Sequence, residues 1–439
     1  MNVCLLVPDF LSGTSFLQQP LDLLYVATIL EKQHWDVSVI DCRIHHMSIK
    51  HLLLQLEMVD YIVVSTTPID QVQNYFVDFR YAYTVKTIEA IKSRFPHKTV
   101  IVYGAHLTAN KVFVYSDIKV DYYIFGEITY TLPALLDALK QGGIVKQIPN
   151  IAIRTKEQIF ETVKNYTLQH PSIPDEVYPA YGMVDMEEYY GTDYINNIPY
   201  IQTRRVVAQG GRGCPYSCSF CHNYFGKVIK YRSATQTAEE LERCYRDYGI
   251  KEVFFLDEVF TLNKSWVREL LCEVVSRGVK LKMTVQTRVD CIDDELLNDL
   301  KLMGVANIWL GVESTSDDIL TKINKGISVS VIKEKIRLVK SYGIQPLAFF
   351  MIGNEGESKK SLQKLISDIK ELEIPYTRSI MICTPRFNTP LGAKAVEQYP
   401  NINTWFDLHG IRGLVNNELD PDDLMQFKDL LRTRLHKTN

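Results

Sequence analysis

Three cysteines with a C-x3-C-x2-C spacing stand close together at positions 214, 218 and 221, just after the β-rich run 205–210. Thiolates are soft ligands that favour zinc or iron–sulfur clusters. A structural zinc site normally takes four ligands, and no fourth cysteine lies nearby. The spacing therefore indicates a cluster in which one iron stays open to another ligand. A zinc site completed by His222, or three unrelated core cysteines, are the alternatives.

The elements that must position these cysteines form a repeated strand–helix pattern. Connections of this length suit right-handed crossovers between parallel strands. Six units, rather than eight, predict a partial, open barrel whose chemistry collects at the carboxyl ends of its strands. The expected strands are 206–210, 252–257, 282–286, 306–311, 346–352 and 379–384, and the expected helices lie near 236–247, 264–277, 293–303, 330–342 and 358–372.

Charged residues follow several of these predicted strands. Asp257 and Glu258 follow the second strand, where a carboxylate can bind a substrate amine, hold a neighbour or interact with a helix dipole. Arg288 follows the third strand and presents a planar donor fork suited to a carboxylate, with an ion pair to Asp290 or Glu313 as the alternative. Glu313 ends the fourth strand, which is apolar, and a buried charge there needs a partner.

The first part of the chain also alternates strands with helices, which predicts a doubly wound parallel sheet covered on both faces. Ligands of such sheets bind outside the carboxyl ends of the strands. The loops expected at those ends are small and polar, and they indicate a nucleotide-like ligand, with ordinary turn chemistry as the alternative. They contain Ser65 and Thr66, then Gly104, His106 and Thr108, then Gly126 and Glu127.

Composition limits the classes of protein that remain. The chain has 439 residues, which suggests two or three domains. Its formal net charge of −3 gives no sign of the basic surface that binds nucleic acid. No apolar run is long enough to span a membrane, and the first residues predict a buried strand rather than a signal peptide. The nine cysteines imply no disulfide framework, so the cytoplasm is the expected compartment.

The cysteine spacing, with Arg212-Gly213-Cys214-Pro215 before it, resembles the radical S-adenosylmethionine (SAM) enzymes. The segment Gly311-Val312-Glu313-Ser314-Thr315-Ser316, followed by Lys325-Gly326, is similar to another signature of that family. The resemblance implies a [4Fe–4S] cluster on the three cysteines, with SAM on the open iron. It also implies SAM contacts at Phe220, Arg288, Glu313 and Gly353, and a substrate side at Asp257 and Glu258. No catalytic residue is assigned.

The first domain resembles the cobalamin-binding domain that precedes many radical SAM barrels, through 20–27, 104–108 and 126–127. The resemblance implies cobalamin contacts at Ser65, Thr66, Gly104, His106, Thr108, Gly126 and Glu127. One departure is plain: the loop 8–15 lacks the histidine that ligates cobalt in such domains. His45 and His46 follow the second strand instead, where a solvated helix start is expected. The departure predicts a cobalt without a protein histidine, or a domain that binds no cobalamin.

The resemblance implies an enzyme that cleaves SAM to a 5′-deoxyadenosyl radical and uses cobalamin to methylate an unactivated carbon of a small-molecule or peptide substrate. Cyclisation, rearrangement or another bond formation with cobalamin idle or absent is the alternative, and a non-catalytic cobalamin or iron–sulfur sensor is a remote one. The expected partners are this substrate and a one-electron reductant such as flavodoxin or ferredoxin, without nucleic acid.

Four regions are expected. They are a cobalamin-binding-like Rossmann-type domain over 1–155, a connector over 156–205, a partial (β/α)6 radical SAM barrel over 206–384, and a short helical extension over 385–439. A helix is expected near 421–435, a short helix over 183–190, and loops over 104–108 and 385–392.

Overall fold

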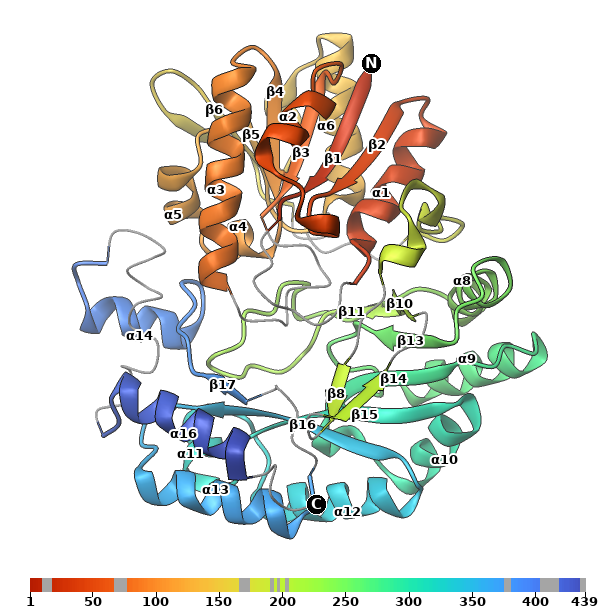
Figure 1. Cartoon of the computed structure of the whole chain (residues 1–439), viewed down its shortest axis with the longest axis vertical. Helices are drawn as coiled ribbons and strands as arrows, with labels where there is room; N and C mark the ends of the chain where they lie inside the picture. Colours follow the sequence, from red (N-terminus) through yellow and green to blue (C-terminus); the bar gives the residue numbers. More distant parts are fainter. Residues whose placement is uncertain are drawn as a thin grey trace. The chain divides into compact units, whose positions relative to one another are not determined.

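The structure is a computed structural model of the whole chain (Figure 1). It describes residues 1–9, 18–66, 77–165, 174–189, 193–195, 198–201, 205–374, 380–402 and 418–434. The chain divides into two compact units, Met1–Tyr189 with Asn223–Tyr231, and Tyr190–His222 with Arg232–Asn439. The boundaries expected at 155, 205 and 384 stay predictions.

The first unit is built on a sheet with the order β2-β1-β3-β4-β5-β6-β7. The first five strands in this order are parallel, as the alternating pattern predicted. The strands are β1 (Asn2–Val7), β2 (Asp36–Asp41), β3 (Tyr61–Ser65), β4 (Thr99–Tyr103), β5 (Tyr122–Ile124), β6 (Ile151–Arg154) and β7 (Ile159–Glu161). The helices are α1 (Leu21–Lys32), α2 (Ile49–Gln55), α3 (Val77–Arg94), α4 (Ala105–Ala109), α5 (Lys111–Asp117) and α6 (Ile128–Gln141).

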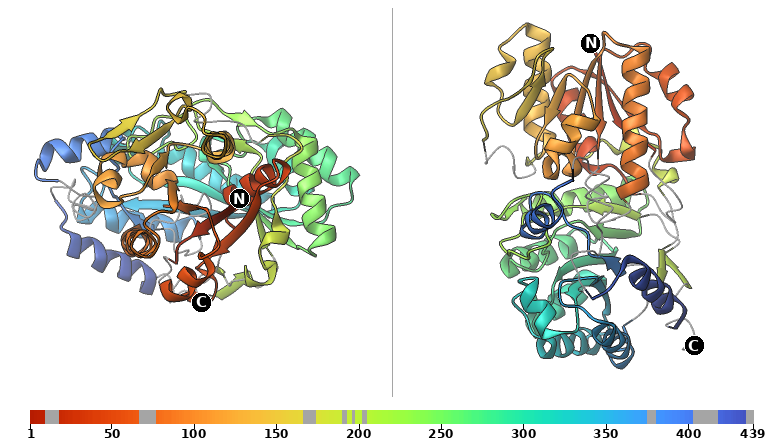
Figure 2. Two further views of the ribbon diagram at one scale, coloured as in Figure 1. Left: turned by 90° about the horizontal axis from the view of Figure 1, so that it is seen from above. Right: turned by 90° about the vertical axis from the view of Figure 1, so that its left-hand side faces the viewer.

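Helices cover both faces of this sheet (Figure 2). On one face, apolar side chains of α1 and α6, including Leu30 and Leu132, form one core cluster with Leu5 and Ile101 of the strands. The near-continuous apolar runs of β1, β3 and β4 are expected for parallel strands buried on both faces. After β1 the chain adds β2 on one side of that strand and β3 on the other, so the topological switch point lies between β1 and β3. Ligands of doubly wound sheets bind at this point.

Several local expectations for the first unit were wrong. The strands β6 and β7 were not predicted; they form an antiparallel hairpin that extends the sheet. His106 lies in the short helix α4 rather than in an extended loop. Residues 183–189 form no α-helix: two short 3₁₀ helices, Tyr181–Met183 and Met186–Glu188, are present instead.

The second unit contains the predicted six-stranded parallel sheet, in the order β10-β13-β14-β15-β16-β17. These strands are β10 (Arg205–Ala208), β13 (Glu252–Phe255), β14 (Lys282–Arg288), β15 (Val305–Glu313), β16 (Gln345–Ile352) and β17 (Ile380–Ile382). Short strands outside the sheet are β8 (Asp193–Ile195), β9 (Ile198–Ile201) and β11 (Gly211–Arg212), and β12 (Lys230–Tyr231) belongs to the first unit.

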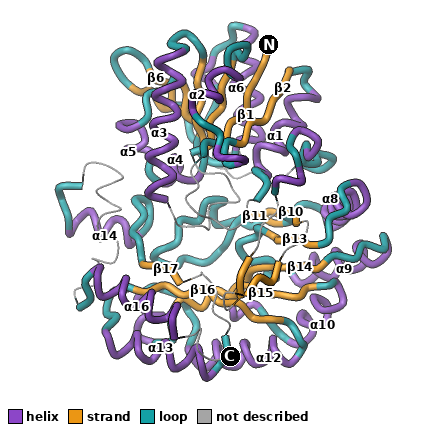
Figure 3. The backbone as a smooth tube through the Cα atoms, in the orientation of Figure 1, coloured by secondary structure: helices purple, strands orange, loops and turns teal. Residues whose placement is uncertain are grey.

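Helices line the outside of this half-barrel, as Figure 3 shows for α9, α10, α12 and α13. The helices of the unit are α8 (Ala234–Asp247), α9 (Lys264–Ser276), α10 (Asp294–Met303), α11 (Asp317–Lys322), α12 (Val329–Ser341), α13 (Lys359–Glu371), α14 (Pro390–Gln398) and α16 (Pro421–Arg434). Of these, α16 confirms the predicted terminal helix. The helix α14 begins inside the segment predicted as a loop, with Thr389 as its cap and Pro390 in its first turn.

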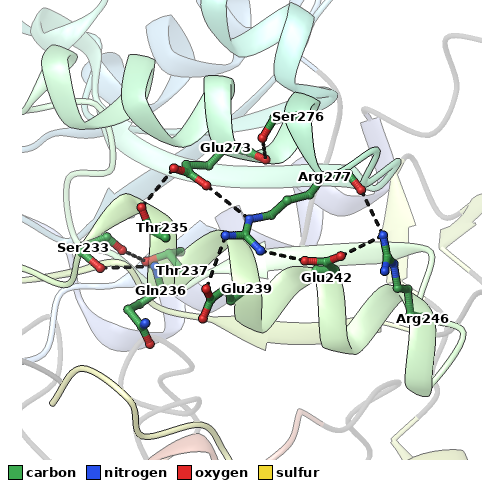
Figure 4. Close-up of polar contacts among 10 residues, drawn as sticks. All are labelled: Ser233, Thr235, Gln236, Thr237, Glu239, Glu242, Arg246, Glu273, Ser276 and Arg277. Carbon is green, nitrogen blue, oxygen red and sulfur yellow. Dashed lines mark hydrogen bonds and ion pairs between the residues drawn. The ribbon is translucent and has the colours of Figure 1, made fainter.

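Side-chain caps and ion pairs fix the outer helices. The side chains of Ser233, Asn263, Asp293 and Ser328 each accept a bond from an amide in the first turn of α8, α9, α10 and α12. Such caps satisfy amides that the helix itself leaves unpaired. Arg277, just after α9, is ion-paired with Glu239 and Glu242 of α8 and with Glu273 of its own helix (Figure 4).

No helix in the described ranges is long and apolar enough to cross a membrane.

Candidate active site

The three cysteines lie in a loop that directly follows β11 (residues 214–221, the cluster loop). Cys214 and Cys218 are partly exposed and Cys221 is exposed. Among the described residues, no group of three or more His, Cys, Asp or Glu side chains is arranged to hold a single metal ion. Three accessible thiols within eight residues are a donor set of the kind that iron–sulfur clusters take. The residues present therefore fit a cluster with three protein ligands.

Asp257 and Glu258 hold the backbone that leads into the cluster loop. Asp257 accepts hydrogen bonds from the amides of Gly210 (3.0 Å) and Gly211, and Glu258 accepts one from the amide of Gly213 (3.1 Å). Burial raises the pKa of each carboxyl to about 7, against the bonds from those amides. The sequence left three roles open for these carboxyl groups: binding a substrate amine, holding a neighbouring segment, or interacting with a helix dipole. The observed contacts are those of the second role.

Glycine is required at position 210 because the ring of Trp266 lies too close for any side chain. A Cβ at this position would lie 2.3 Å from the ring of Trp266, and Trp266 in turn donates from its indole nitrogen to the carbonyl of Arg232. The amide of Arg232 donates to the carbonyl of Gly210. The strand end before the cysteines is therefore packed tightly on α9.

Arg288 ends β14 with its guanidinium in contact with the cluster loop. Its Nε and one terminal nitrogen donate to Asp290 at 2.9 and 3.0 Å, which is one of the two ion pairs considered from the sequence. Its other terminal nitrogen lies 3.7 Å from Cys218 Sγ. The guanidinium also lies over the ring of Tyr216, 3.7 Å from its centre.

Glu313 ends β15 and is 7% exposed. It forms an ion pair of 3.1 Å with Lys325, which is 5% exposed. The φ of Glu313 is +67°, a conformation uncommon outside glycine, and the register of β15 with β16 shifts at this point. Gly311 makes room for the pair, since a Cβ there would lie 2.9 Å from Lys325 Nζ. The sequence had indicated that Glu313 needs a partner but did not name Lys325.

Gly353 lies just beyond β16 with a φ of +82°. Its amide and that of Asn354 donate to the buried carboxyl of Glu357. Asn354 also donates from its side chain to the carbonyl of Met351 at 2.6 Å. The turn that would approach SAM is thus shaped by residues that the sequence analysis did not single out.

Two further side-chain amides are buried in this unit, at Gln209 directly after β10 and at Gln286 within β14. Gln209 Nε2 and Gln286 Nε2 have no hydrogen-bond partner within the described part of the chain, and the residues are 1% and 4% exposed. Buried donors are normally satisfied, so these two groups call for a polar ligand. They are candidate donors for a polar molecule such as SAM.

In the first unit, the loops after β3, β4 and β5 are joined by hydrogen bonds. Thr66 donates from its amide and hydroxyl to the carbonyl of Tyr103, and the amide of Gly126 donates to the hydroxyl of Thr108 at 2.9 Å. Gly104 and Gly126 have φ values of +126° and +75°, which few other residues adopt. These loops present small residues and backbone to a ligand, which fits the amide-rich edge of a corrin.

The other residues of this unit that were predicted to contact cobalamin are buried and differ in their contacts. Ser65 is fully buried at the end of β3. Glu127 is buried and accepts from the amide and hydroxyl of Thr129 at the start of α6. The ring of His106 is packed against that of Tyr81, with centres 4.2 Å apart. His46 has an exposed side chain that contacts Asp9. Most of the histidine-free loop 8–15 lies outside the described residues.

Sequence reasoning missed a buried group beside these loops. The hydroxyl of Tyr103 donates to Asp22 of α1 at 2.9 Å, and the hydroxyl of Tyr224 donates to the carbonyl of Gly126 at 2.7 Å. Asp22 lies in the segment 20–27 that carries the resemblance, which was the available signal. Tyr224 belongs to the first unit although it follows the cysteines in sequence.

Family models match both units. The B12 binding domain model matches residues 14–136, and the radical SAM superfamily model matches residues 209–369. The chain belongs to the radical SAM superfamily and to its members that carry a B12-binding domain ahead of the barrel. It is therefore a radical SAM enzyme, and its domains imply a [4Fe–4S] cluster, SAM and cobalamin.

Similar proteins align with most of this chain. An uncharacterised methyltransferase of Pyrococcus horikoshii is 28% identical over 381 residues, which cover 86% of this chain and 78% of that protein. The anaerobic magnesium-protoporphyrin IX monomethyl ester cyclase of Synechocystis is 30% identical over 312 residues, which cover 69% of this chain but only 59% of that protein. The radical SAM methyltransferase TsrM of Kitasatospora setae, solved with tryptophan and a SAM analogue, has the same fold, with a TM-score of 0.73, 18% identity and coverage of 92% and 77%.

Proposed function

We propose that the protein is a cobalamin-dependent radical SAM methyltransferase that acts on an unactivated carbon of a small-molecule or peptide substrate. The observation that carries the proposal is the union, in one chain, of a B12-binding domain and a radical SAM domain whose loop presents three accessible cysteines. The methyltransferases among its relatives support methylation. The cyclase relative keeps ring closure as the second candidate.

When bound, the cluster supplies the electron that cleaves SAM, and cobalamin supplies a carrier for the methyl group. Cys214, Cys218 and Cys221 are the proposed cluster ligands. Glu313, Phe220 and Gly353 are the proposed SAM contacts, and Gln286 is a further polar group for the same site because its buried amide has no partner among the described residues. The chain's part is to bind, orient and exclude water, while the cofactors carry the chemistry.

Asp257 and Glu258 are proposed as positioning residues rather than substrate contacts, since their carboxyl groups accept bonds from the backbone before the cluster loop. The cobalamin contacts are proposed at the loops of Ser65, Thr66, Gly104, His106, Thr108, Gly126 and Glu127. Of these, the positive-φ glycines offer the closest backbone approach.

A substrate and an electron donor are required by any enzyme of this superfamily. Flavodoxin or ferredoxin is the proposed donor. We also propose the reducing cytoplasm as its compartment, and the spacing of the nine cysteines, which implies no disulfide framework, supports this.

Methyl-labelled SAM separates the two candidate reactions. The reduced enzyme, loaded with cobalamin, is incubated with labelled SAM and an extract of cells that lack its gene. A labelled product that needs both enzyme and cobalamin supports methylation. A new product without label, formed whether or not cobalamin is supplied, supports ring closure or rearrangement and overturns the methyltransferase proposal.

A further inference from the structure

Arg288 is buried at the end of β14, with 5% of the residue exposed. Its donors point in three directions: to the carboxyl of Asp290, to the carbonyl of Lys325 at 2.7 Å, and to Cys218 Sγ. The fork that the sequence analysis assigned to the SAM carboxylate is thus already used by groups of the chain. The direction toward Cys218 is the one that bears on the cluster.

The same residue fixes the shape of the cluster loop. The guanidinium lies on the ring of Tyr216, and the hydroxyl of Tyr216 is 3.2 Å from Cys291 Sγ. Stacking of this kind is favoured by arginine's flat, weakly hydrated cation. The loop is therefore held on the side of Cys218 by a cation that cannot lose its charge.

Two neighbouring contacts hold the next residues of the loop. The side chain of Asn324 donates to the carbonyl of Ser217 at 2.8 Å, and the amide of Ser219 donates to the carbonyl of Ile323 at 2.9 Å. Ile323 and Asn324 thus bind the loop on both sides of Cys218, and Lys325 follows them directly. Because Arg288 donates to the carbonyl of Lys325, it connects this segment to the cysteine.

Hydrogen bonds to the sulfur ligands and nearby charge set the potential of an iron–sulfur cluster. A donor to a ligating thiolate withdraws electron density, and a positive charge stabilises the more negative reduced state. Both effects make the cluster easier to reduce. Asp290 offsets part of the charge of Arg288, but it does not occupy the nitrogen that faces Cys218.

We propose that Arg288 is a positioning residue of the cluster loop and that its bond to Cys218 Sγ raises the reduction potential of the cluster. The inference rests on the proposed function, since it requires a cluster on the three cysteines. It assigns Arg288 to the cluster ligand rather than to the carboxylate of SAM.

The test compares anaerobically reconstituted wild type with Arg288→Gln and Arg288→Lys, all without SAM or cobalamin. Iron and sulfide content, the electron paramagnetic resonance (EPR) spectrum of the reduced cluster and its midpoint potential are measured. At a fixed applied potential, we expect Arg288→Gln to lower the ratio of reduced to oxidised cluster about tenfold, which is ~59 mV for one electron. Arg288→Lys keeps the charge but not the fork, so we expect a smaller shift in the same direction.

Arg277→Gln is the matched control. It removes the same kind of side chain from the ion pairs between α8 and α9, outside the cluster loop, and its potential should equal that of wild type. Asn324→Gly tests the second contact. Glycine accepts the φ of +52° at this position but cannot donate to Ser217, so we expect a lower iron content or a broadened EPR signal.

A midpoint unchanged in both Arg288 variants overturns the proposal. A separate calorimetric titration with SAM then shows whether Arg288 binds the SAM carboxylate, since both variants would bind SAM more weakly. Global unfolding of both variants overturns it as well, because the residue is then structural. Loss of the cluster from both variants, with circular dichroism unchanged, supports the positioning role. A wild type that takes up no cluster defeats the proposed function itself and is distinguishable from all of these.

Discussion

Lys325 Nζ lies 3.1 Å from Glu313 Oε1, and both side chains are at least nine-tenths buried. The pair joins the end of β15 to the segment after α11 that also binds the cluster loop. A buried ion pair is weak support for stability by itself, but removal of one partner leaves an uncompensated charge. The pair therefore couples the proposed SAM residue to the packing of the barrel.

Lys325→Met should lower the free energy of unfolding by about 3 kcal/mol, because the carboxylate of Glu313 then stays buried without its cation. Urea unfolding of the cofactor-free protein measures the change. The double variant Lys325→Met/Glu313→Gln should recover most of the loss. Equal losses in the single and double variants would show that the pair does not determine the effect.

Asp257→Asn should reduce both stability and cluster uptake. The amide side chain keeps an acceptor for one of the two glycine amides and leaves the other buried amide without a partner, which costs about 2 kcal/mol. Iron content per chain after reconstitution is the measurement. Asp299→Asn, on the outer face beside Arg268, is the control and should leave iron content unchanged. Full iron content in Asp257→Asn would contradict the positioning role.

Stability should fall as the pH rises from about 4.5 to about 7, in part because of Glu357. Burial raises the pKa of its carboxyl from near 4.5 to about 7. Between these values the folded state holds a proton that the unfolded state has released, so stability is fully present below pH 4.5 and is lost as the pH passes 7. The loss amounts to about 3 kcal/mol.

Glu357→Gln should flatten that part of the pH profile, because the amide stays neutral and still accepts a bond from the turn at Gly353. Urea unfolding at a series of pH values measures the slope for both proteins. An identical slope in wild type and variant would mean that Glu357 ionises in the folded state as it does in water.

Gly210→Ala should destabilise the second unit by about 2 kcal/mol, as overpacking of a close-packed site does, since the new methyl group meets the ring of Trp266 at 2.3 Å. Gly182→Ala is a matched control, because nothing lies within 4 Å of the Cβ it would gain. Thermal unfolding followed by tryptophan fluorescence compares the two. An equal, small effect at both positions would contradict the tight packing of the strand end.

The order of strands and helices was predictable from sequence wherever apolar strands alternate with amphipathic helices. The six barrel strands and the first five strands of the other sheet follow that pattern. The hairpin β6–β7 was not predicted, because its strands pair antiparallel with no helix between them and so fall outside the alternating strand–helix pattern. The helix α14 was not predicted, because it contains Pro390 and Gly392, residues that ordinarily indicate a turn. At Gly392 a Cβ would collide with the backbone of Arg386, a contact that sequence does not reveal.

Some residues of the candidate site could likewise be predicted from the sequence, and others could not. The cysteines and Glu313 could be proposed as site residues from their types and spacing alone. Lys325, Asn324 and Tyr216 act through contacts between segments far apart in the chain, so only the folded structure assigns them. For Arg288, the sequence identified a planar hydrogen-bond donor but could not identify the groups to which it donates.

We propose that Cys214, Cys218 and Cys221 hold the cluster that cleaves SAM. The most direct measurement is the formation of 5′-deoxyadenosine from SAM by the anaerobically reconstituted, reduced protein and by its Cys218→Ala variant. We predict formation by the wild type and a loss of at least tenfold in the variant. Equal formation by both proteins, or none by a wild type with full iron content, would contradict the account.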